Sequence, residues 1–388
     1  MIIIPIEITR RPPMASAIEN HSQHRVVQCA GVIDTPFGNV YSMENANRLQ
    51  PPWCSNTFQP STYSMTSLLD PAILFFLFGI LAGGLRSNLE IPAQISRFLS
   101  LYLLMALGLK GGFALAKSGL TPEVVLSLGA ALVLAFMVPL VGYLLLRRFL
   151  NGYDAAAIAA TYGSVSAVTF VTAVQYLDTH GVEYGGHMAA AMALMESPAI
   201  IMAVLLANLV RQRDPERAAK GVANPPLKKI LHESLTDGAQ LLLIGAMVVG
   251  LLVGPSGESA MKPFSVDLFK GMLAFFLMDM GLLTARNLGK LKGKSPWLLA
   301  YAIGAPLVHA AAALALGVAL DLSVGNITLL MVLAASASYI AVPAVIRHAI
   351  AEANPSLYFG MSLGLTFPFN ILFGIPLYAE MAQRFALR

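Results

Sequence analysis

Apolar stretches follow one another from about residue 68 onward, each roughly 17 to 25 residues long, enough for a helix to cross a hydrocarbon core about 30 Å thick. Hydrophobic residues make up 56% of the chain and charged residues 12%, whereas a soluble domain is about a quarter charged. The alternating pattern of about ten residues that is typical of a membrane β-barrel is absent from the sequence. We therefore predict an all-α integral membrane protein in a lipid bilayer.

The apolar stretches predict about ten transmembrane helices, numbered spans 1 to 10. Several carry Gly, Ser or Pro near the middle, where a helix can break, and we predict broken helices at spans 4 and 9. The predicted spans cover residues 68–86, 91–117, 122–148, 153–178, 187–211, 236–254, 264–288, 296–320, 325–351 and 355–383.

Residues 1–64 differ from the rest of the chain, because they are rich in Pro, Ser and Asn and show no sustained period. Met65 stands immediately before the first span. We predict that 1–64 are a disordered or non-native N-terminal extension. The remainder divides into a first five-helix repeat (65–211), a cytoplasmic loop (212–235) and a second five-helix repeat (236–388).

The two halves resemble each other at a nearly constant offset. An odd number of spans per half makes the two repeats enter the membrane from opposite sides, which is the inverted-repeat plan of secondary transporters. The matching positions are 104–109 with 277–282 (offset 173), Ser164 and Ser166 with Ser336 and Ser338 (offset 172), and Pro198 with Pro368 (offset 170).

Basic residues gather in the loops after the odd-numbered spans. Leaving aside residues 1–64, these loops hold fifteen Lys and Arg residues and the opposite side holds five. Because cytoplasmic loops are enriched in Lys and Arg, we predict a multi-pass protein with both termini outside. The formal charge of +4 is explained in the same way, and we expect no nucleic-acid partner.

Enzyme signatures are absent from the sequence: there is no G-x-S-x-G, no H-E-x-x-H and no Walker loop. The two cysteines, Cys29 and Cys54, show no metal-site spacing with histidine. We therefore expect a protein that is not an enzyme, that has no cofactor, and that is driven by an ion gradient.

Spans 4 and 9 are the first candidates for a substrate site. Gly163, Ser164 and Ser166 lie in span 4, and an unwound turn there would expose backbone groups and hydroxyls to an anion or to sodium. Span 9 repeats the pattern with Ser336, Ser338 and Tyr339, followed by Pro343, which weakens a helix. The alternative is that small residues serve only close helix packing.

Four further residues are candidate sodium ligands. Thr169 follows the span 4 serines, and Glu196 precedes Pro198 in span 5. Thr366 and Asn370 flank Pro368 in span 10. A proline frees backbone groups, so oxygen ligands beside it can hold an ion. For Glu196 a purely structural hydrogen bond is the alternative.

Three other ionisable residues lie within predicted spans, where they usually face protein or water. Lys110 in span 2 and Asp279 in span 7 occupy nearly matching turns of the two repeats, which suggests a buried ion pair. Lys110 is otherwise a candidate to attract the anion. His309 in span 8 is either a proton relay or, more commonly for such residues, a hydrogen-bonded helix histidine.

With these residues in view, the chain from about Thr66 onward resembles the sodium-dependent bicarbonate permeases of the SbtA type. The motifs that carry the resemblance are 108–112, 163–169, 195–199, 305–309, 334–338 and 353–356. Cyanobacterial members differ at span 9, where an acidic residue and a glycine follow the serines and this chain has Tyr339. The resemblance implies sodium as the coupling ion, bicarbonate or another small anion as substrate, and a place in the bacterial inner membrane.

The same resemblance implies a homotrimer, an elevator-like movement of a core domain against a gate domain, and a PII-like cytoplasmic regulator. Two alternatives remain at this point. One is a sodium-coupled symporter of a small organic anion, similar to the bile-acid carriers. The other is a membrane receptor that signals to a PII-like partner.

Overall fold

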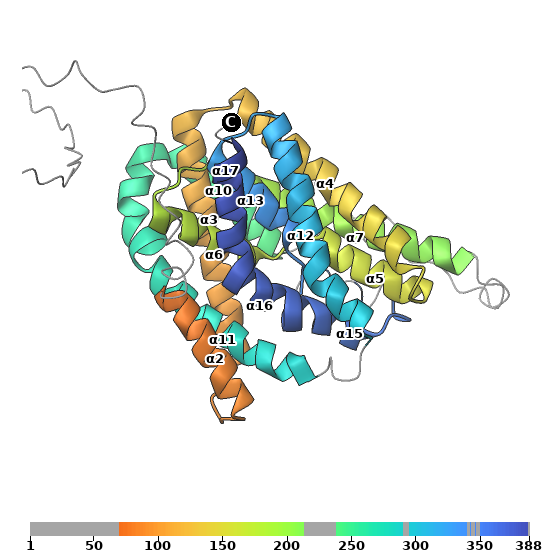
Figure 1. The fold of residues 1–388 in the computed structure, drawn as a ribbon. Helices are drawn as coiled ribbons and strands as arrows, with labels where there is room; N and C mark the ends of the chain where they lie inside the picture. Colours follow the sequence, from red (N-terminus) through yellow and green to blue (C-terminus); the bar gives the residue numbers. More distant parts are fainter. Residues whose placement is uncertain are drawn as a thin grey trace, which may run out of the picture. The chain divides into compact units, whose positions relative to one another are not determined.

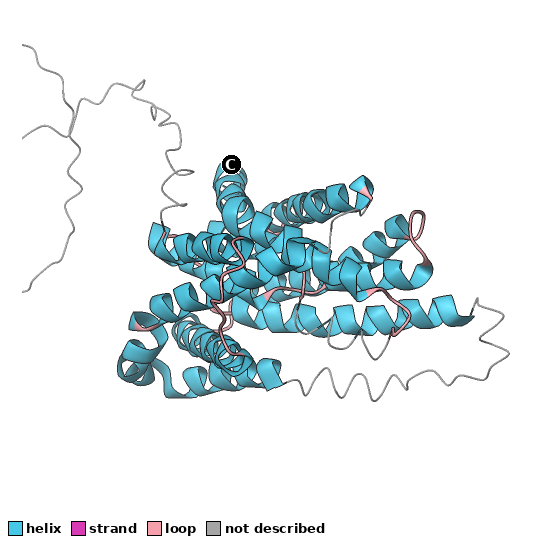
Figure 2. Cartoon of the chain, turned by 90° about the horizontal axis from the view of Figure 1, so that it is seen from below, coloured by secondary structure: helices cyan, strands magenta, loops and turns pink. Residues whose placement is uncertain are grey.

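The computed structural model describes residues 70–212, 238–289, 295–339 and 350–386, together with Val342 and Ile346. Throughout these ranges the regular structure is helical (Figure 2), which confirms the predicted all-α class. The predicted extension 1–64 and nearly all of the loop 212–235 lie outside the described residues, so these two domain boundaries stay predictions.

The described chain runs through helices that Figure 1 shows in sequence order. The first half comprises α2 (Pro71–Gly84), α3 (Ala93–Ser118), α4 (Pro122–Leu146), α5 (Gly152–Gly163), α6 (Ala167–His180) and α7 (Met188–Gln212). The second half comprises α10 (Gly238–Lys262), the π-helical turn η1 (Pro263–Asp267), α11 (Phe269–Leu288), α12 (Pro296–Ala319), α13 (Val324–Ala335), α15 (Pro355–Met361), η3 (Ser362–Thr366), α16 (Phe367–Phe369), η4 (Asn370–Gly374) and α17 (Ile375–Ala386).

Seven helical stretches within the described ranges are long and apolar enough to cross a membrane, and two shorter apolar helices, α2 and α13, accompany them. One of the seven, Gly238–Leu288, covers both predicted spans 6 and 7. Eight of the ten predicted segments therefore contain one such helix each, and spans 6 and 7 share one. The number of crossings itself stays a prediction.

Two pairs of helices pack closely against each other at glycine residues. α3 packs along α10, and α11 packs along α2 (Figure 1). A Cβ atom added to Gly250 of α10 would lie 2.6 Å from the Leu109 carbonyl oxygen, and one added to Gly281 of α11 would lie 3.0 Å from Gly79 Cα. Backbones approach this closely only where no side chain intervenes, as in small-residue interfaces of membrane helices. We label α2, α3, α10 and α11 the gate helices, after the gate domain that the family resemblance implies.

The gate pairs also support the predicted repeat. Gly108 of α3 corresponds to Gly281 of α11 at an offset of 173, and Gly79 of α2 corresponds to Gly250 of α10 at an offset of 171. The pairing of span 2 with span 6 thus matches the pairing of span 7 with span 1. Each pair therefore takes one helix from each predicted repeat, and the inverted repeat itself stays a prediction.

The helix breaks predicted in spans 4 and 9 are present. α5 ends at Gly163 and α6 begins at Ala167, and both Ser164 and Ser166 have extended backbones. In span 9, α13 ends at Ala335 and Ser336 is extended. Pro343, expected to weaken the second half of span 9, lies outside the described residues.

The amino ends of α5 and α13, remote from the breaks, are each held by a hydrogen bond from the other half of the chain. Asp154, in the first turn of α5, accepts a hydrogen bond at Oδ1 from the Asn354 amide at 2.7 Å. Asn326, in the first turn of α13, accepts one at Oδ1 from the Gly185 amide at 2.7 Å. Asp154 and Asn326 are 172 positions apart. Side-chain oxygens in a first turn also complement the positive end of the helix dipole.

These contacts place the broken spans at the centre of the protein. In Gly152–His180, 94% of the most apolar 18-residue segment is buried, compared with 28% of the corresponding segment in Pro296–Ala319. The helices α4, α10 and α12 expose leucine, valine and phenylalanine side chains, as lipid-facing helices do. Any polar group at the breaks is therefore shielded from lipid by protein.

We predict that Gly250→Ala destabilises the protein and that Gly245→Ala does not. The added methyl group at Gly250 collides with the α3 backbone, and overpacking of this kind costs roughly 1 to 3 kcal/mol. At Gly245, on the exposed side of α10, a Cβ atom meets nothing within 4 Å. Thermal unfolding of the purified protein in detergent measures both. Equal midpoints for the two variants would contradict the gate-helix packing.

Candidate functional site

The ends of the two broken spans contact each other directly. The Ser338 amide donates to the Thr161 carbonyl oxygen at 2.9 Å, and the Ser166 amide donates to Ser336 Oγ at 3.0 Å. All four residues are at most 4% exposed. The crossing is therefore a buried junction in which each break satisfies backbone groups of the other.

On the span 9 side several polar groups already have partners, although His309 Nδ1 has none among the described residues. Ser336 Oγ donates to the Leu333 carbonyl at 2.9 Å, and Asn370 Nδ2 donates to the Ala335 carbonyl at 2.9 Å. His309 hydrogen-bonds the backbone of Ala334. The last carbonyls of a helix have no partner within it, so these three side chains close the carboxyl end of α13.

On the span 4 side, two side-chain hydroxyls lack hydrogen-bond partners within the described structure. Ser164 Oγ and Thr169 Oγ1 are buried and have no hydrogen-bond partner among the residues that the structure describes. Ser166 caps α6, since its Oγ accepts a hydrogen bond from the Thr169 amide at 3.2 Å. The amides of Ala167 and Val168, the first two of α6, cannot be satisfied by the helix's own hydrogen bonds. Ser164 thus precedes the start of α6 and Thr169 lies in its first turn, at the positive end of the helix dipole.

Gly163 and Thr366 fix the geometry of this break. A Cβ atom at Gly163 would lie 2.6 Å from the Pro139 ring of α4, so only glycine fits. Thr366 Oγ1 lies 2.6 Å from Tyr162 Oη and donates to the Ala302 carbonyl at 2.7 Å. Thr366 thereby joins spans 4, 8 and 10. Its predicted role as a sodium ligand is untested, and its hydroxyl is occupied in this structure.

Asn370 and Tyr339 are also engaged. Asn370 Oδ1 accepts from Tyr378 Oη at 2.9 Å while its amide holds α13. Tyr339 Oη lies 3.5 Å from the sulfur of Met280, a gate residue, and also interacts with the Ser166 side chain. The predicted sodium-binding role of Asn370 and substrate-binding role of Tyr339 stay predictions.

Glu196 lies half-buried in α7, the helix that packs against α4 and α5. Its predicted sodium-binding role also stays a prediction. Within the described ranges, no three His, Cys, Asp or Glu side chains gather as a metal site.

The predicted ion pair between Lys110 and Asp279 is wrong. Lys110 Nζ lies 2.7 Å from Asp178 Oδ2 and 5.1 Å above the centre of the Phe269 ring. Asp279 instead accepts a hydrogen bond from Ser96 Oγ. On the predicted inverted-repeat plan, matching positions are neighbours only near the axis that relates the two halves. Lys110 and Asp279 lie away from it.

Lys110 also lies far from the crossing. Its partner Asp178 is twelve residues beyond Ser166 on α6, a rise of about 18 Å. The structure thus brings the serines and Thr169 together but not Lys110 with them. A direct substrate contact by Lys110 stays an untested prediction.

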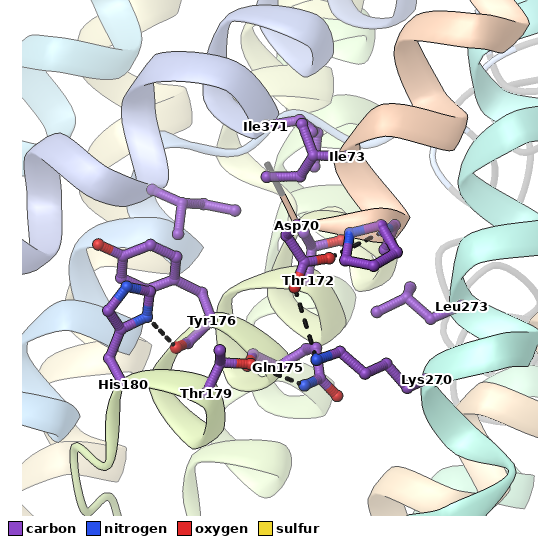
Figure 3. Close-up of a pocket in the computed structure, with 13 residues that line it drawn as sticks. Asp70, Ile73, Thr172, Gln175, Tyr176, Thr179, His180, Lys270, Leu273 and Ile371 are labelled. Carbon is purple, nitrogen blue, oxygen red and sulfur yellow. Dashed lines mark hydrogen bonds and ion pairs between the residues drawn. The ribbon is translucent and has the colours of Figure 1, made fainter. Parts of the chain in front are cut away.

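Two cavities flank the carboxyl half of α6. One, of about 300 Å³, lies between α6, the gate helices α2 and α11, and span 10 (Figure 3). Its lining includes Thr172, Gln175, Lys270 and Ile371. The other, of about 770 Å³, lies on the side of α3 and includes Lys110 and Asp178. The sequence signalled neither Asp178 nor Lys270, because both lie near span ends, where charge is unremarkable.

Residues 71–383 match the model of the Na⁺-dependent bicarbonate transporter superfamily. The chain belongs to this family. The match confirms the family that the sequence motifs resembled, and the protein is a multi-pass membrane transporter and not an enzyme. A search of curated proteins gave no match. Membership in this family supports sodium as the coupling ion and bicarbonate as the transported anion.

We predict that Asn370→Asp destabilises the transporter at neutral pH. The carboxylate cannot donate to the Ala335 carbonyl, so two acceptors face each other in a buried place, and an unsatisfied buried group costs about 1 to 3 kcal/mol. Asn287→Asp is the matched control, since Asn287 Nδ2 donates to Leu283 of its own helix. Thermal unfolding in detergent compares them, and a smaller loss for Asn370→Asp than for the control would contradict the positioning role.

Proposed function

We propose that this transporter takes up bicarbonate together with sodium, and that both bind where span 4 is interrupted. The observation that carries the assignment is the pair of buried hydroxyls, Ser164 Oγ and Thr169 Oγ1, without partners among the described residues. A buried polar group without a partner is costly, and in native structures it commonly marks a place that a ligand or ion fills. Ser336 and Ser338 line the same junction from span 9.

Sodium is the natural occupant of the hydroxyl side. It is a hard cation that binds neutral oxygens, and in transporters with broken helices the unwound carbonyls supply further ligands. The carboxyl end of α5 offers such carbonyls at Tyr162 and Gly163. Glu196 of the adjacent α7 is our candidate for an additional negative charge near the ion.

Bicarbonate suits the amino end of α6. The Ala167 and Val168 amides point out of the helix start, where the dipole favours an anion. Bicarbonate carries one negative charge and presents oxygens to these donors. An ion pair of sodium and bicarbonate is neutral overall, so the two species together lower the cost of entering a buried site.

The packing supports an elevator-like movement. The gate helices pair with one another through glycine, whereas α4, α5, α7, α12 and α13 pack together around the crossing. A gate that is stiff within itself lets the other helices move past it as a body carrying the site. We retain, from the family resemblance, a homotrimer, a PII-like regulator, the bacterial inner membrane and outward termini.

We predict that Ser164→Ala and Thr169→Val raise the sodium concentration needed for half-maximal bicarbonate uptake by about tenfold, since a hydrogen bond or ligand to a charged species is worth roughly 1.5 to 3 kcal/mol. Proteoliposomes with labelled bicarbonate and an inward sodium gradient measure this. Thr328→Val is the matched control, because Thr328 is buried but donates to Val324 of its own helix.

A second readout separates a binding role from a structural one. Without sodium, both variants should unfold at the same temperature as the parent or higher, because an unpaired buried hydroxyl has been removed. With sodium, they should gain less stability than the parent does. Absence of sodium-stimulated uptake by the unaltered protein refutes the proposed function. Unchanged sodium dependence in both variants refutes the site.

A further inference from the structure

We propose that the 300 Å³ cavity between α6 and the gate helices α2 and α11 is a vestibule that receives the anion, and that Lys270 is the residue that attracts it. This inference rests on the proposed function and extends it to a second place on the substrate's path. Figure 3 shows Lys270 and Gln175 together at one end of the cavity, with Ile73 and Ile371 at the other.

On both α6 and span 10, residues that line the cavity lie within one helical turn of residues of the proposed site. Thr172 lines the cavity and lies three residues beyond Thr169 on α6. Ile371 lines it and directly follows Asn370, which holds the end of α13. Residues three or four apart on a helix share a face, so the cavity continues the face of α6 that carries Thr169.

The face of α6 toward this cavity is polar along its length. Thr172, Gln175 and Thr179 all line the cavity, at spacings of three and four residues. On the opposite side of the cavity stand Leu273 of α11 and Ile73 of α2. The wall opposite α6 thus carries the charges of Lys270 and Asp70 beside these apolar side chains. A cavity with few strong polar contacts suits a small hydrated anion that must move on and not remain bound.

Lys270 is held loosely, in contrast to the lysines of the neighbouring cavity. Lys110 and Lys117 lie 2.7 Å and 2.6 Å from the carboxylates of Asp178 and Glu258. Lys270 Nζ lies 3.6 Å from Asp70 Oδ2, which is too long for a hydrogen bond. Its ammonium group therefore keeps donors that an arriving anion can use.

Asp70 explains the loose contact. Its Oδ1 accepts a hydrogen bond from the Ala72 amide at 2.8 Å and thereby caps α2. A carboxylate fixed by capping cannot turn to follow the lysine. On the predicted topology, the starts of spans 1 and 7 and the end of span 4 share the outer side. Asp70 and Lys270 then stand at the outer mouth of the cavity, where the anion enters.

The first test measures the apparent KM for bicarbonate in proteoliposomes at fixed sodium. Lys270→Gln should raise the apparent KM roughly two- to fivefold at low ionic strength, because one attractive charge is lost, with little change in the maximal rate. Added choline chloride should shrink the difference. Asp70→Asn, which preserves the cap, should leave the apparent KM equal or lower. Lys262→Gln, an exposed lysine that lines neither cavity, is the matched control.

A second test does not depend on transport. Gln175→Cys, in a chain whose Cys29 and Cys54 are replaced by serine, places a thiol in the cavity wall beside Lys270. Anionic and cationic methanethiosulfonate reagents of similar size then label it. Lys270→Gln should lower the ratio of anionic to cationic labelling rates by roughly threefold or more.

The outcomes separate the two proposals. Normal sodium-stimulated uptake with an unchanged apparent KM and labelling ratio in Lys270→Gln overturns the vestibule and leaves the proposed function standing. A fall in the labelling ratio in a protein without sodium-stimulated uptake supports an anion-attracting cavity and refutes bicarbonate symport. An equal KM change in Lys262→Gln also overturns the specific role of Lys270.

Discussion

The fold depends on one constraint: backbone groups at a helix break inside a membrane must find partners within the protein. Here each of the two breaks provides hydrogen-bond partners for the other. The Ser338 amide reaches the Thr161 carbonyl at 2.9 Å, and the Ser166 amide reaches Ser336 Oγ at 3.0 Å. Neither span 4 nor span 9 can be interrupted alone, because each interruption leaves groups that only the other satisfies. The interlocking of the two halves follows from this need.

The junction has matching extended backbones at Ser164 and Ser336 but differs in its side chains. Ser336 closes α13, and Asn370 and His309 reach the same helix end. On the other side Ser164 and Thr169 keep their hydroxyl oxygens unpaired within the described structure. Under the proposed function, this difference lets the two predicted repeats hold a cation and an anion at different places.

Much of this arrangement could be predicted from the sequence, and the limits have a physical cause. Hydrophobic length predicts the helices, and the small residues in the middle of spans 4 and 9 predict the breaks, because both are local patterns. The Lys110 pairing was predicted wrongly because the offset identifies equivalent positions but not the axis that relates them. Asn370 was recognised as polar, yet its engagement with Ala335 depends on how span 10 crosses span 9. No local pattern contains that crossing.

The half-helix α6 connects the proposed site to the gate in two different ways. On one side its Asp178 is held by Lys110 of α3 at 2.7 Å. On the other side it borders the cavity at Lys270 of α11, where α6 and the gate are not joined by an ion pair within the described chain. Because an ion pair joins α6 to α3 and a cavity separates α6 from α2 and α11, α6 can move relative to α2 and α11 without breaking that ion pair. If the site moves past the gate as proposed, Lys110 and Asp178 must then separate or travel together, because a contact of this length cannot stretch. If they separate, the ion pair belongs to one conformation of the proposed transport cycle, the one in which the cavity beside Lys270 is present.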